Sequence, residues 1–247
     1  MILFSTDIDG TLYDGSPDSA IRFQGVWRKI AQSLPSPPLL AYNTGRSLAN
    51  TQSLIADSPL PSPDYYICGV GTVIVERVSG EPLPGWDEHL SANWDFAQVK
   101  DIVSTHSPAI FQPDECQNPF KCSWFWTDAK SSERSAINEQ LRTSGIDAQV
   151  VYSSQRDLDV LPAKANKGNA STFLQRRLGL DDVPLIVAGD SGNDISLFEA
   201  EDARGIVVSN AESSLMKAAS SPPHFHASEP CIKGVEQGLA HFLHLSG

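Results

Sequence analysis

Short apolar runs alternate with amphipathic stretches along most of the 247-residue chain. Each run stops at a polar residue or a glycine, which favours buried parallel strands. The runs occupy residues 2–6, 39–42, 65–68, 184–188 and 205–208. Helical spacing marks residues 20–33, 50–56, 168–178 and 213–219. This repeated strand–helix order predicts a doubly wound α/β core with a mostly parallel, Rossmann-like sheet, in which ligands gather at the carboxyl ends of the strands.

The alternation stops at the string EPLPGW, residues 81–86, which supplies two prolines and a glycine. Two aromatic strand-like segments, KCSWFWTD and AQVVYSS, follow with a helical stretch at 131–144 between them. A separate α+β module of roughly 70 to 80 residues is large enough to fold around its own core. We therefore predict that residues 1–82 and 160–247 form the main domain and that residues 83–159 form an inserted domain.

The composition is that of an ordinary soluble globular protein, with 40% hydrophobic and 19% charged residues. The formal net charge of -12 excludes a broad basic face, so neither nucleic acid nor an anionic membrane is an expected partner. A small anionic substrate is still allowed if a few Lys or Arg side chains converge locally.

The four cysteines lack the paired spacing of a zinc site or disulfide framework, and His224/His226 and His241/His244 lack nearby acidic or cysteine partners. We expect reduced thiols and structural histidines. The N-terminus has no basic leader, and no apolar run approaches the ~18 residues of a membrane span. We therefore expect a cytoplasmic protein.

Two aspartates, Asp7 and Asp9, end the first strand in the string DIDGT. Neighbouring carboxylates repel one another in a site of low dielectric constant, so a cation or a proton is needed to offset the repulsion. A second acidic string, GDSGND, places Asp190 and Asp194 after another buried strand. If the two strands are neighbours, their carboxylates converge on one point, where Mg²⁺ is the suitable cation.

Two further segments supply hydroxyl and cationic groups. Thr44, Gly45 and Arg46 follow the second strand, and the threonine hydroxyl with nearby backbone N–H groups could hold phosphate oxygens at a helix N-terminus. Lys167 opens another predicted helix and could balance the charge of a phosphate and of the carboxylates. Either segment alone is weak evidence, but their occurrence with the aspartates predicts phosphate chemistry.

These four motifs, DIDGT, NTGR, NKGNA and GDSGND, resemble in this order the signature motifs of the haloacid dehalogenase superfamily of phosphohydrolases. An insertion between the threonine and lysine motifs resembles the second type of α/β cap in that superfamily. Finer strings, including YNTGRS, NPFKCSWFW and VVYSSQRDLDVLP, are similar to sucrose-phosphate and mannosylfructose-phosphate phosphatases.

The resemblance implies a Mg²⁺-dependent sugar-phosphate phosphatase, with sucrose 6F-phosphate as the first expected substrate. Asp7 would form an aspartyl-phosphate and Asp9 would transfer protons. The metal would be held by Asp7, Asp9, Asp190 and Asp194. The catalytic set is thus Asp7, Asp9, Thr44 and Lys167, and the substrate-binding residues expected in the core are Thr11, Gly45, Arg46 and Asn193.

Substrate choice is expected to lie in the cap, where Asn118, Lys121 and Ser123 could bind sugar hydroxyls. Trp124 and Trp126 either contact the sugar or pack the cap sheet, and the sequence leaves this open. Asp157 and Asp159 are interpreted as a hinge or turn without chemistry. The resemblance also suggests a monomer that takes its substrate from the synthase making the sugar phosphate.

Three other classes of function compete with this interpretation. A phospho-receiver domain has a similar acidic cluster, threonine and lysine, but lacks an aspartate two residues after the phosphorylated one and a large insertion. A phosphomannomutase-like transferase shares the cap type and is the closer rival. A binding protein without turnover is not supported, because every catalytic position is filled.

Overall fold

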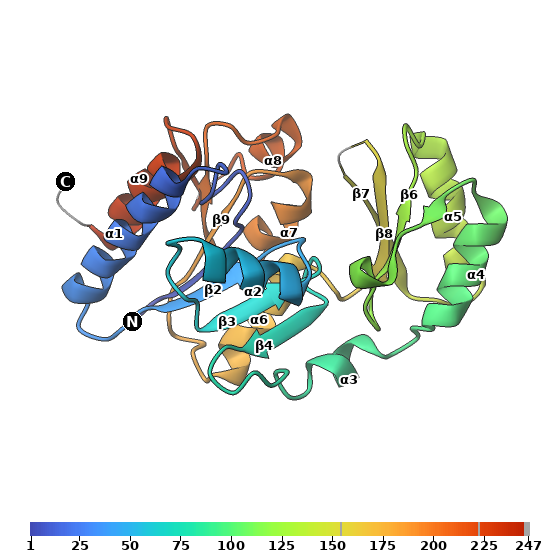
Figure 1. Cartoon of the computed structure of the whole chain (residues 1–247), viewed down its shortest axis with the longest axis horizontal. Coiled ribbons are helices and arrows are strands. Elements are labelled where there is room, and N and C mark those ends of the chain that lie inside the picture. The colour runs from blue at the N-terminus through green and yellow to red at the C-terminus, as the bar shows by residue number, and fades with distance from the viewer. Residues whose placement is uncertain (154, 222, 245–247) are drawn as a thin grey trace. The chain divides into compact units, whose positions relative to one another are not determined.

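The computed structural model describes residues 1–153, 155–221 and 223–244. The chain forms two compact units (Figure 1). The core unit comprises Met1–Leu83 and Lys167–Gly247, and the inserted unit comprises Pro84–Asn166. The predicted boundary between residues 159 and 160 falls inside a strand that pairs with one neighbour as far as Pro162, and the inserted unit continues to Asn166.

Within the described residues, the core unit contains a seven-stranded sheet in the order β11-β10-β9-β1-β2-β3-β4. Its pairs are parallel except β3–β4, so the predicted α/β class with a mostly parallel sheet is confirmed. The strands are β1 (Leu3–Thr6), β2 (Leu39–Asn43), β3 (Tyr65–Cys68), β4 (Val73–Glu76), β9 (Leu185–Gly189), β10 (Arg204–Val207) and β11 (Phe225–His226).

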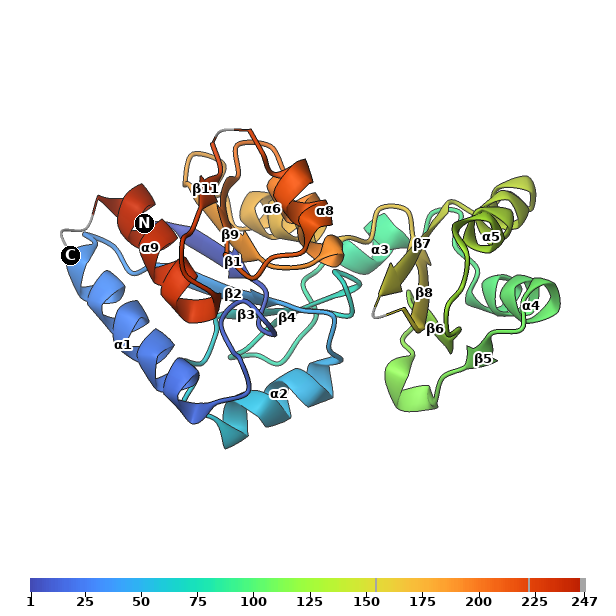
Figure 2. The same ribbon diagram turned by 90° about the horizontal axis from the view of Figure 1, so that it is seen from above.

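Helices of the core unit flank this sheet (Figures 1 and 2). They are α1 (Pro17–Ser33), α2 (Leu48–Asp57), α6 (Lys167–Arg177), α7 (Ile195–Phe198), α8 (Ser213–Ala218) and α9 (Cys231–Leu243), with a 3₁₀ turn η2 (Gly192–Asp194). α1 starts where the Ser16 hydroxyl accepts the backbone N–H of Ser19, with a proline at the first helical position. Its Phe23 and Ile30, seven residues apart, share one helical face and are buried.

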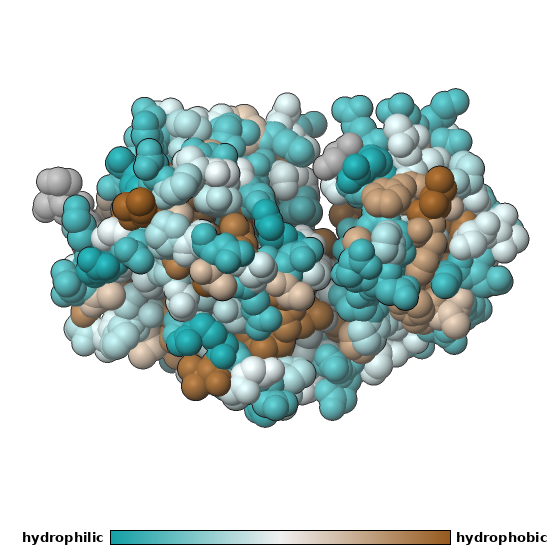
Figure 3. Space-filling model, viewed as in Figure 1, coloured by the Kyte–Doolittle hydropathy of each residue, from teal (hydrophilic) through white to brown (hydrophobic). Residues whose placement is uncertain are grey.

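The core of this unit is built from alternate residues of the central strands. Phe4 is fully buried and stacks on Trp27 of α1 with ring centroids 5.9 Å apart, whereas its neighbour Ser5 contacts Ser171 of α6. Because successive strand residues point to opposite faces, β1 has helices to pack against on both. The strand is thereby held rigidly up to Thr6, the residue before Asp7. Hydrophilic residues predominate on the face of this unit seen in Figure 3.

The inserted unit is a four-stranded antiparallel sheet in the order β5-β6-β8-β7, with helices packed on it (Figure 2). Its elements are α3 (Trp86–Leu90), α4 (Phe96–His106), β5 (Ile110–Phe111), η1 (Asp114–Cys116), β6 (Cys122–Phe125), α5 (Ser131–Thr143), β7 (Ala148–Ser153) and β8 (Asp157–Pro162). Trp124 and Trp126 are buried in its hydrophobic cluster with Ile137 of α5. The two tryptophans thus pack the unit, which resolves the alternative that the sequence left open.

Candidate active site

Asp7 lies at the carboxyl end of the central strand β1 and is only 5% exposed. Its backbone N–H donates to the carbonyl of Ala188, which continues the pairing with β9 one residue beyond β1. The chain then turns sharply at Gly10, whose φ is +77°. An L residue rarely adopts this conformation, and a Cβ there would lie 2.3 Å from Asp190 Oδ2. Gly10 therefore lets the loop after β1 approach the loop after β9, which carries Asp190.

Lys167 joins these carboxylates from the first residue of α6. Its Nζ donates to Asp7 Oδ1 at 2.7 Å and to Asp194 Oδ1 at 2.6 Å, and the side chain has no solvent exposure. An ammonium without water needs such partners, since an unpaired buried charge is very costly. The structure thus brings together Asp7, Lys167 and Asp194 from three separate motifs.

Asp7, Asp190 and Asp194 each offer a carboxylate oxygen, and these oxygens lie within 4.8 Å of one another. Three hard oxygen ligands in so small a volume are suited to Mg²⁺. Asp190 is held by the buried hydroxyl of Thr11, which donates to its Oδ1 at 3.3 Å. Thr11, which we predicted to bind substrate, contacts a candidate metal ligand in this structure.

The pKa shifts within the acidic cluster, which consists of Asp7, Asp190 and Asp194, also fit a divalent cation. Burial raises the pKa of Asp7 to about 8, although the charge of Lys167 acts in the opposite direction. Burial, followed by the charge of Asp194, raises the pKa of Asp190 to about 6. Burial alone would lower the pKa of Lys167, but the charges of Asp194 and Asp7 outweigh it and raise that pKa. A cation between the carboxylates would offset the cost of ionising them.

Asp194 has both carboxylate oxygens occupied. Oδ1 accepts from Lys167, while Oδ2 accepts from the backbone N–H groups of Asp190 and Ser191, both at 3.0 Å. This residue therefore fixes the loop that carries Asp190 and fixes the ammonium of Lys167. Among the three clustered carboxylates, it is the one most committed to positioning its neighbours.

Asp9 points to a different partner from Asp7. Both of its oxygens are bound by Arg46, through Nε at 2.6 Å and an Nη at 2.7 Å, and about half of its side chain is exposed. This fork-shaped contact gives Arg46 a defined role beside Asp9. The Asp9 side chain is not part of the carboxylate cluster, so only its backbone carbonyl remains as the predicted metal ligand.

Thr44 and Gly45 lie at the end of β2. Thr44 is 1% exposed, and its hydroxyl accepts the backbone N–H of Arg46 at 3.2 Å. We predicted that Thr44 lies at a helix N-terminus. The next helix, α2, begins at Leu48 and is capped by the Ser47 hydroxyl, so Thr44 lies in the loop before it. A Cβ on Gly45 would lie 3.9 Å from the Asn193 amide nitrogen. The structure thus brings Gly45 close to Asn193 of the GDSGND loop.

Side chains of the inserted unit form a polar cluster of Lys121, Ser123 and Asp159. The buried Ser123 hydroxyl donates to Asp159 Oδ1 at 2.6 Å, and Lys121 Nζ lies 3.4 Å from the same oxygen. Ser123 and Asp159 are directly paired residues of β6 and β8. The interpretation of Asp159 as a hinge or turn residue is wrong, since it lies within a regular strand whose opposite face is apolar.

Asn118 stabilises a turn rather than standing free. Its Oδ1 accepts the backbone N–H of Phe120 at 2.9 Å, and its backbone pairs with Lys121 across the turn. Ser123 is fully buried, so its hydroxyl is committed to Asp159. Lys121 retains about 12% side-chain exposure beside Asp159, and Asn118 is also partly exposed.

The sequence profile of the family described as sucrose-6F-phosphate phosphohydrolase matches residues 1–243. The chain belongs to this family. The resemblance inferred from the four motifs is thereby confirmed. In this member of the sucrose-6F-phosphate phosphohydrolase family, the four strings that carry the resemblance contain Asp7, Thr44, Lys167 and Asp190.

Known relatives agree with this assignment over the whole chain. The chain is 37% identical to a mannosylfructose-phosphate phosphatase of Agrobacterium fabrum, covering 97% of this chain and 96% of that one. It is 34% identical to a probable sucrose-phosphatase of Arabidopsis thaliana, covering 98% of this chain but only 59% of the longer plant protein. A sucrose-phosphatase from Synechocystis, solved with sucrose and phosphate, is 31% identical, with a TM-score of 0.87 and coverage of 98% and 97%.

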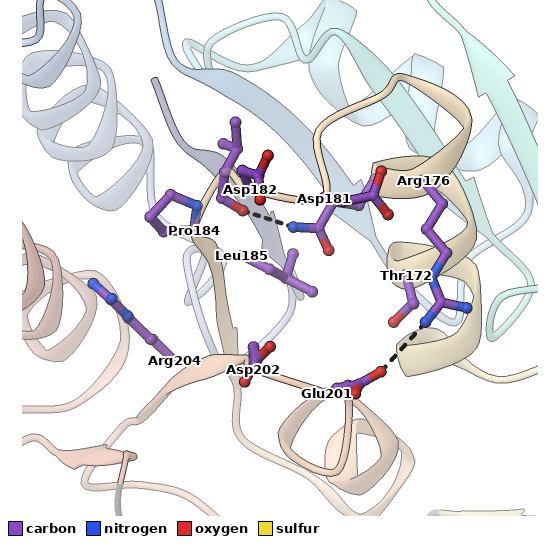
Figure 4. A pocket seen from close by; sticks show the side chains of 11 residues that line it. Thr172, Arg176, Asp181, Asp182, Pro184, Leu185, Glu201, Asp202 and Arg204 are labelled. Carbon is purple, nitrogen blue, oxygen red and sulfur yellow. Dashed lines mark hydrogen bonds and ion pairs between the residues drawn. The ribbon is translucent and has the colours of Figure 1, made fainter.

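A pocket of about 390 Å³ in this family member is lined by residues other than Asp7, Asp190 and Asp194 (Figure 4). Its lining includes Leu185 and Arg204, the first residues of β9 and β10, so it lies at the amino edge of the sheet. Arg176 in the pocket is already paired with Glu201 at 3.3 Å. The acidic cluster at the carboxyl edge, where α/β folds place their ligands, is therefore the stronger candidate site.

Sequence reasoning missed two residues that hold the loops after β1 and β9. Asn210 donates to the carbonyl of Gly10 at 2.8 Å and accepts from the backbone of Cys231. Glu212 accepts the backbone N–H of Gly192, and its own N–H donates to the carbonyl of Asp190. Both follow β10, so their position after another strand end was the only signal that could have found them.

The remaining sequence expectations concern cysteines, histidines and membranes. All four cysteines are free. His224 accepts the backbone N–H of Gly205, and His241 stacks on Phe225 with centroids 4.8 Å apart. Over the part of the chain that the structure describes, no helix combines the length and apolar character needed to cross a bilayer.

Proposed function

We propose that this protein is a Mg²⁺-dependent phosphatase that hydrolyses a disaccharide phosphate, with sucrose 6F-phosphate as the first candidate. The observation that carries the proposal is the buried Asp7 carboxylate, bound by Lys167 at the carboxyl end of the central strand in a chain of this family. Mannosylfructose-phosphate is the second candidate, because the relative named for that activity is 37% identical over nearly the full length of both chains.

In the proposed reaction, one oxygen of Asp7 attacks phosphorus in line with the leaving sugar oxygen. The phosphorus–oxygen bond to the sugar breaks as the aspartyl-phosphate forms, and Asp9 gives the departing oxygen a proton. Asp9 then takes a proton from water, which attacks the aspartyl-phosphate and releases inorganic phosphate. Arg46 binds both Asp9 oxygens, so Asp9 has to leave Arg46 before it transfers a proton.

The other groups stabilise charge on the phosphoryl oxygens. We propose that Thr44 and Lys167 bind these oxygens, helped by Gly45, Asn193 and the backbone beside them. Asp7, Asp190 and the Asp9 carbonyl would hold Mg²⁺, with Asp194 positioning this set. When bound, Mg²⁺ supplies positive charge that neutralises the phosphate and lets Asp7 remain ionised.

The polar face of the inserted unit is proposed to bind the sugar. The paired side chains of Lys121 and Asp159 provide one donor and one acceptor that match sugar hydroxyls. The Ser123 hydroxyl, which donates to Asp159, fixes the position of that carboxylate. Asn118 is proposed to shape the adjoining turn. We also infer that the protein acts as a cytoplasmic monomer and receives its substrate from the synthase that makes the sugar phosphate; light scattering of the purified protein tests the monomer.

A phosphate-release assay tests the proposed function. The purified protein is incubated with sucrose 6F-phosphate, mannosylfructose-phosphate, several monosaccharide phosphates and p-nitrophenyl phosphate, with and without Mg²⁺. We expect preference for a disaccharide phosphate, dependence on Mg²⁺ and loss of activity in Asp7→Asn. Full activity of the Asp7→Asn variant would exclude the proposed nucleophile, and preference for a monosaccharide phosphate would exclude the proposed substrate class.

A further inference from the structure

A buried polar network lies beneath the acidic cluster, where apolar packing would be expected. It consists of Asn43 at the end of β2, Ser5 of β1 and Ser171 of α6, each with no solvent exposure. The hydroxyls of Ser5 and Ser171 are 2.7 Å apart. The Asn43 amide nitrogen lies 3.0 Å from Ser171 Oγ and 3.3 Å from Ser5 Oγ, so these two hydroxyls share one of its two hydrogens. Three polar side chains thus join two strands to one helix.

This network ends on the backbone of Lys167. The Asn43 amide nitrogen donates to the Lys167 carbonyl at 2.9 Å, and the Ser171 hydroxyl donates to the same oxygen at 2.9 Å. On the next residue, a Cβ on Gly168 would lie 1.9 Å from the carbonyl oxygen of Ser196 in α7. The first turn of α6 is therefore held against α7 at Gly168 and bound by the network at Lys167.

Packing alone does not account for Asn43. Its Oδ1 is a buried oxygen without a hydrogen-bond partner among the described residues, and an unsatisfied buried carbonyl reduces stability. An apolar residue of the same size would avoid that loss. The feature that an apolar residue would lack is the donor that Asn43 offers to the Lys167 carbonyl.

The position of Lys167 is also unusually demanding. Its side chain has four rotatable bonds and could place the ammonium at many points, yet Nζ meets Asp7 and Asp194 at 2.7 and 2.6 Å. If the backbone at Lys167 shifted by about 1 Å, the side chain would have to change its torsion angles to keep both contacts within the hydrogen-bond range of roughly 2.7–3.2 Å. A fixed backbone is what makes this short, two-sided contact reproducible.

We propose that Asn43, supported by Ser5 and Ser171, is a positioning residue that sets the location of the Lys167 ammonium. It acts through Lys167 and touches neither substrate nor metal ligand. The inference rests on the proposed role of Lys167 at the phosphoryl group. It adds to the site a residue that lies one position before Thr44, so the same β2 terminus serves both the threonine and the lysine.

The test compares two buried side-chain amides, Asn43 and Gln175, which donate hydrogen bonds to backbone carbonyls near opposite ends of α6. Asn43→Leu removes the amide bound near its first residue, whereas Gln175→Leu removes one that donates to the carbonyls of Leu180 and Val183 beyond its last turn. Ser171→Ala is a smaller change that removes one donor to Lys167 and keeps the proposal testable if Asn43→Leu does not fold. Rates are measured with p-nitrophenyl phosphate and Mg²⁺, and stability by thermal unfolding.

We expect Asn43→Leu to lower kcat by about 10- to 100-fold and Ser171→Ala by about 3- to 10-fold, the range seen when supporting residues of a site are removed. KM should change by less than about 3-fold in both. Gln175→Leu should lose comparable thermal stability but keep kcat within about 2-fold. Introduced into Lys167→Met, Asn43→Leu should cause no further fall, because residues that act through one another are not additive.

A second measurement needs neither substrate nor metal. In protein labelled with ¹⁵N-lysine, the buried Lys167 ammonium should give a slowly exchanging ¹H–¹⁵Nζ signal that is lost in Lys167→Met. We expect this signal to shift or broaden in Asn43→Leu and to stay unchanged in Gln175→Leu. An unchanged signal in Asn43→Leu, equal kcat in the two Leu variants, or a full additional loss in the Lys167→Met background would each overturn the proposal. If no phosphate ester is hydrolysed at all, the proposed function fails while the NMR comparison still decides the role of Asn43.

Discussion

Gly10 offers the sharpest test of whether the loops after β1 and β9 form the proposed Mg²⁺ site. In Gly10→Ala, the new Cβ would lie 2.3 Å from Asp190 Oδ2 and 2.9 Å from Asp190 Cγ. Carbon and oxygen atoms normally approach only to about 3.3 Å, so the Asp190 carboxylate has to retreat by roughly 1 Å. Metal–ligand distances tolerate changes of only about 0.2 Å. The substitution should therefore displace a candidate ligand without removing any polar atom.

The expected magnitude has two separable parts. Placing an L residue at a φ of +77° costs roughly 1–2 kcal/mol of unfolding free energy, or about 2–8 °C in Tm for a chain of this size. Displacing Asp190 should weaken Mg²⁺ binding by about 10- to 100-fold, which is about 1.4–2.8 kcal/mol of binding free energy. The first part is a backbone effect, and only the second belongs to the site.

Gly15→Ala is the matched control. Gly15 has a φ of +90°, but a Cβ there would meet no atom within 4 Å. Both variants should lose similar stability, whereas only Gly10→Ala should bind Mg²⁺ more weakly in isothermal titration and require more Mg²⁺ for half-maximal phosphate release. If Gly10→Ala and Gly15→Ala bind Mg²⁺ with equal affinity, the Gly10–Asp190 contact does not shape the metal site.

Three further outcomes follow from the same geometry. Asp9→Asn should lower kcat by about 10²- to 10⁴-fold while Mg²⁺ affinity by titration stays near that of the unchanged protein, and unaltered turnover would remove Asp9 from proton transfer. Asp194→Ala should destabilise the protein by about 3–5 kcal/mol in denaturant unfolding, because the buried Lys167 ammonium loses a partner 2.6 Å away, and a loss below 1 kcal/mol would contradict that pairing. Lys121→Ala should raise KM for the disaccharide phosphate but not for p-nitrophenyl phosphate, and equal changes in both would argue against sugar binding by Lys121.

The core fold was predictable because its signals are local. Runs such as 2–6 and 184–188 are followed directly by an acid or a glycine, and parallel strands place their carboxyl ends at one edge. That rule predicts that Asp7 and Asp190 lie at the same edge of the sheet, and the pairing of β1 with β9 then brings them close together. It could not show that Asp194 uses both of its oxygens, or that Thr11 binds Asp190, because those contacts depend on the path of two loops.

The inserted unit was less predictable for a physical reason. Asp157 and Asp159 were interpreted as a hinge or turn, yet their alternation with apolar residues describes a strand with one apolar face. Asp159 is tolerated in that strand because Ser123 and Lys121 lie beside it. Pairing across strands, rather than the local sequence, decided its place.

The point where the chain returns to the core unit has a consequence for protein engineering. The core unit resumes at Lys167, so no spacer separates the last residue of the inserted unit from the lysine that contacts Asp7. At the other junction, Leu83 is anchored through its backbone N–H to Ile74 of β4. A chimera that exchanges residues 84–166 for those of a relative can therefore tolerate a change of length near residue 84, where the lysine is distant in sequence. At residue 166 a single added or deleted residue would alter the register of the lysine itself.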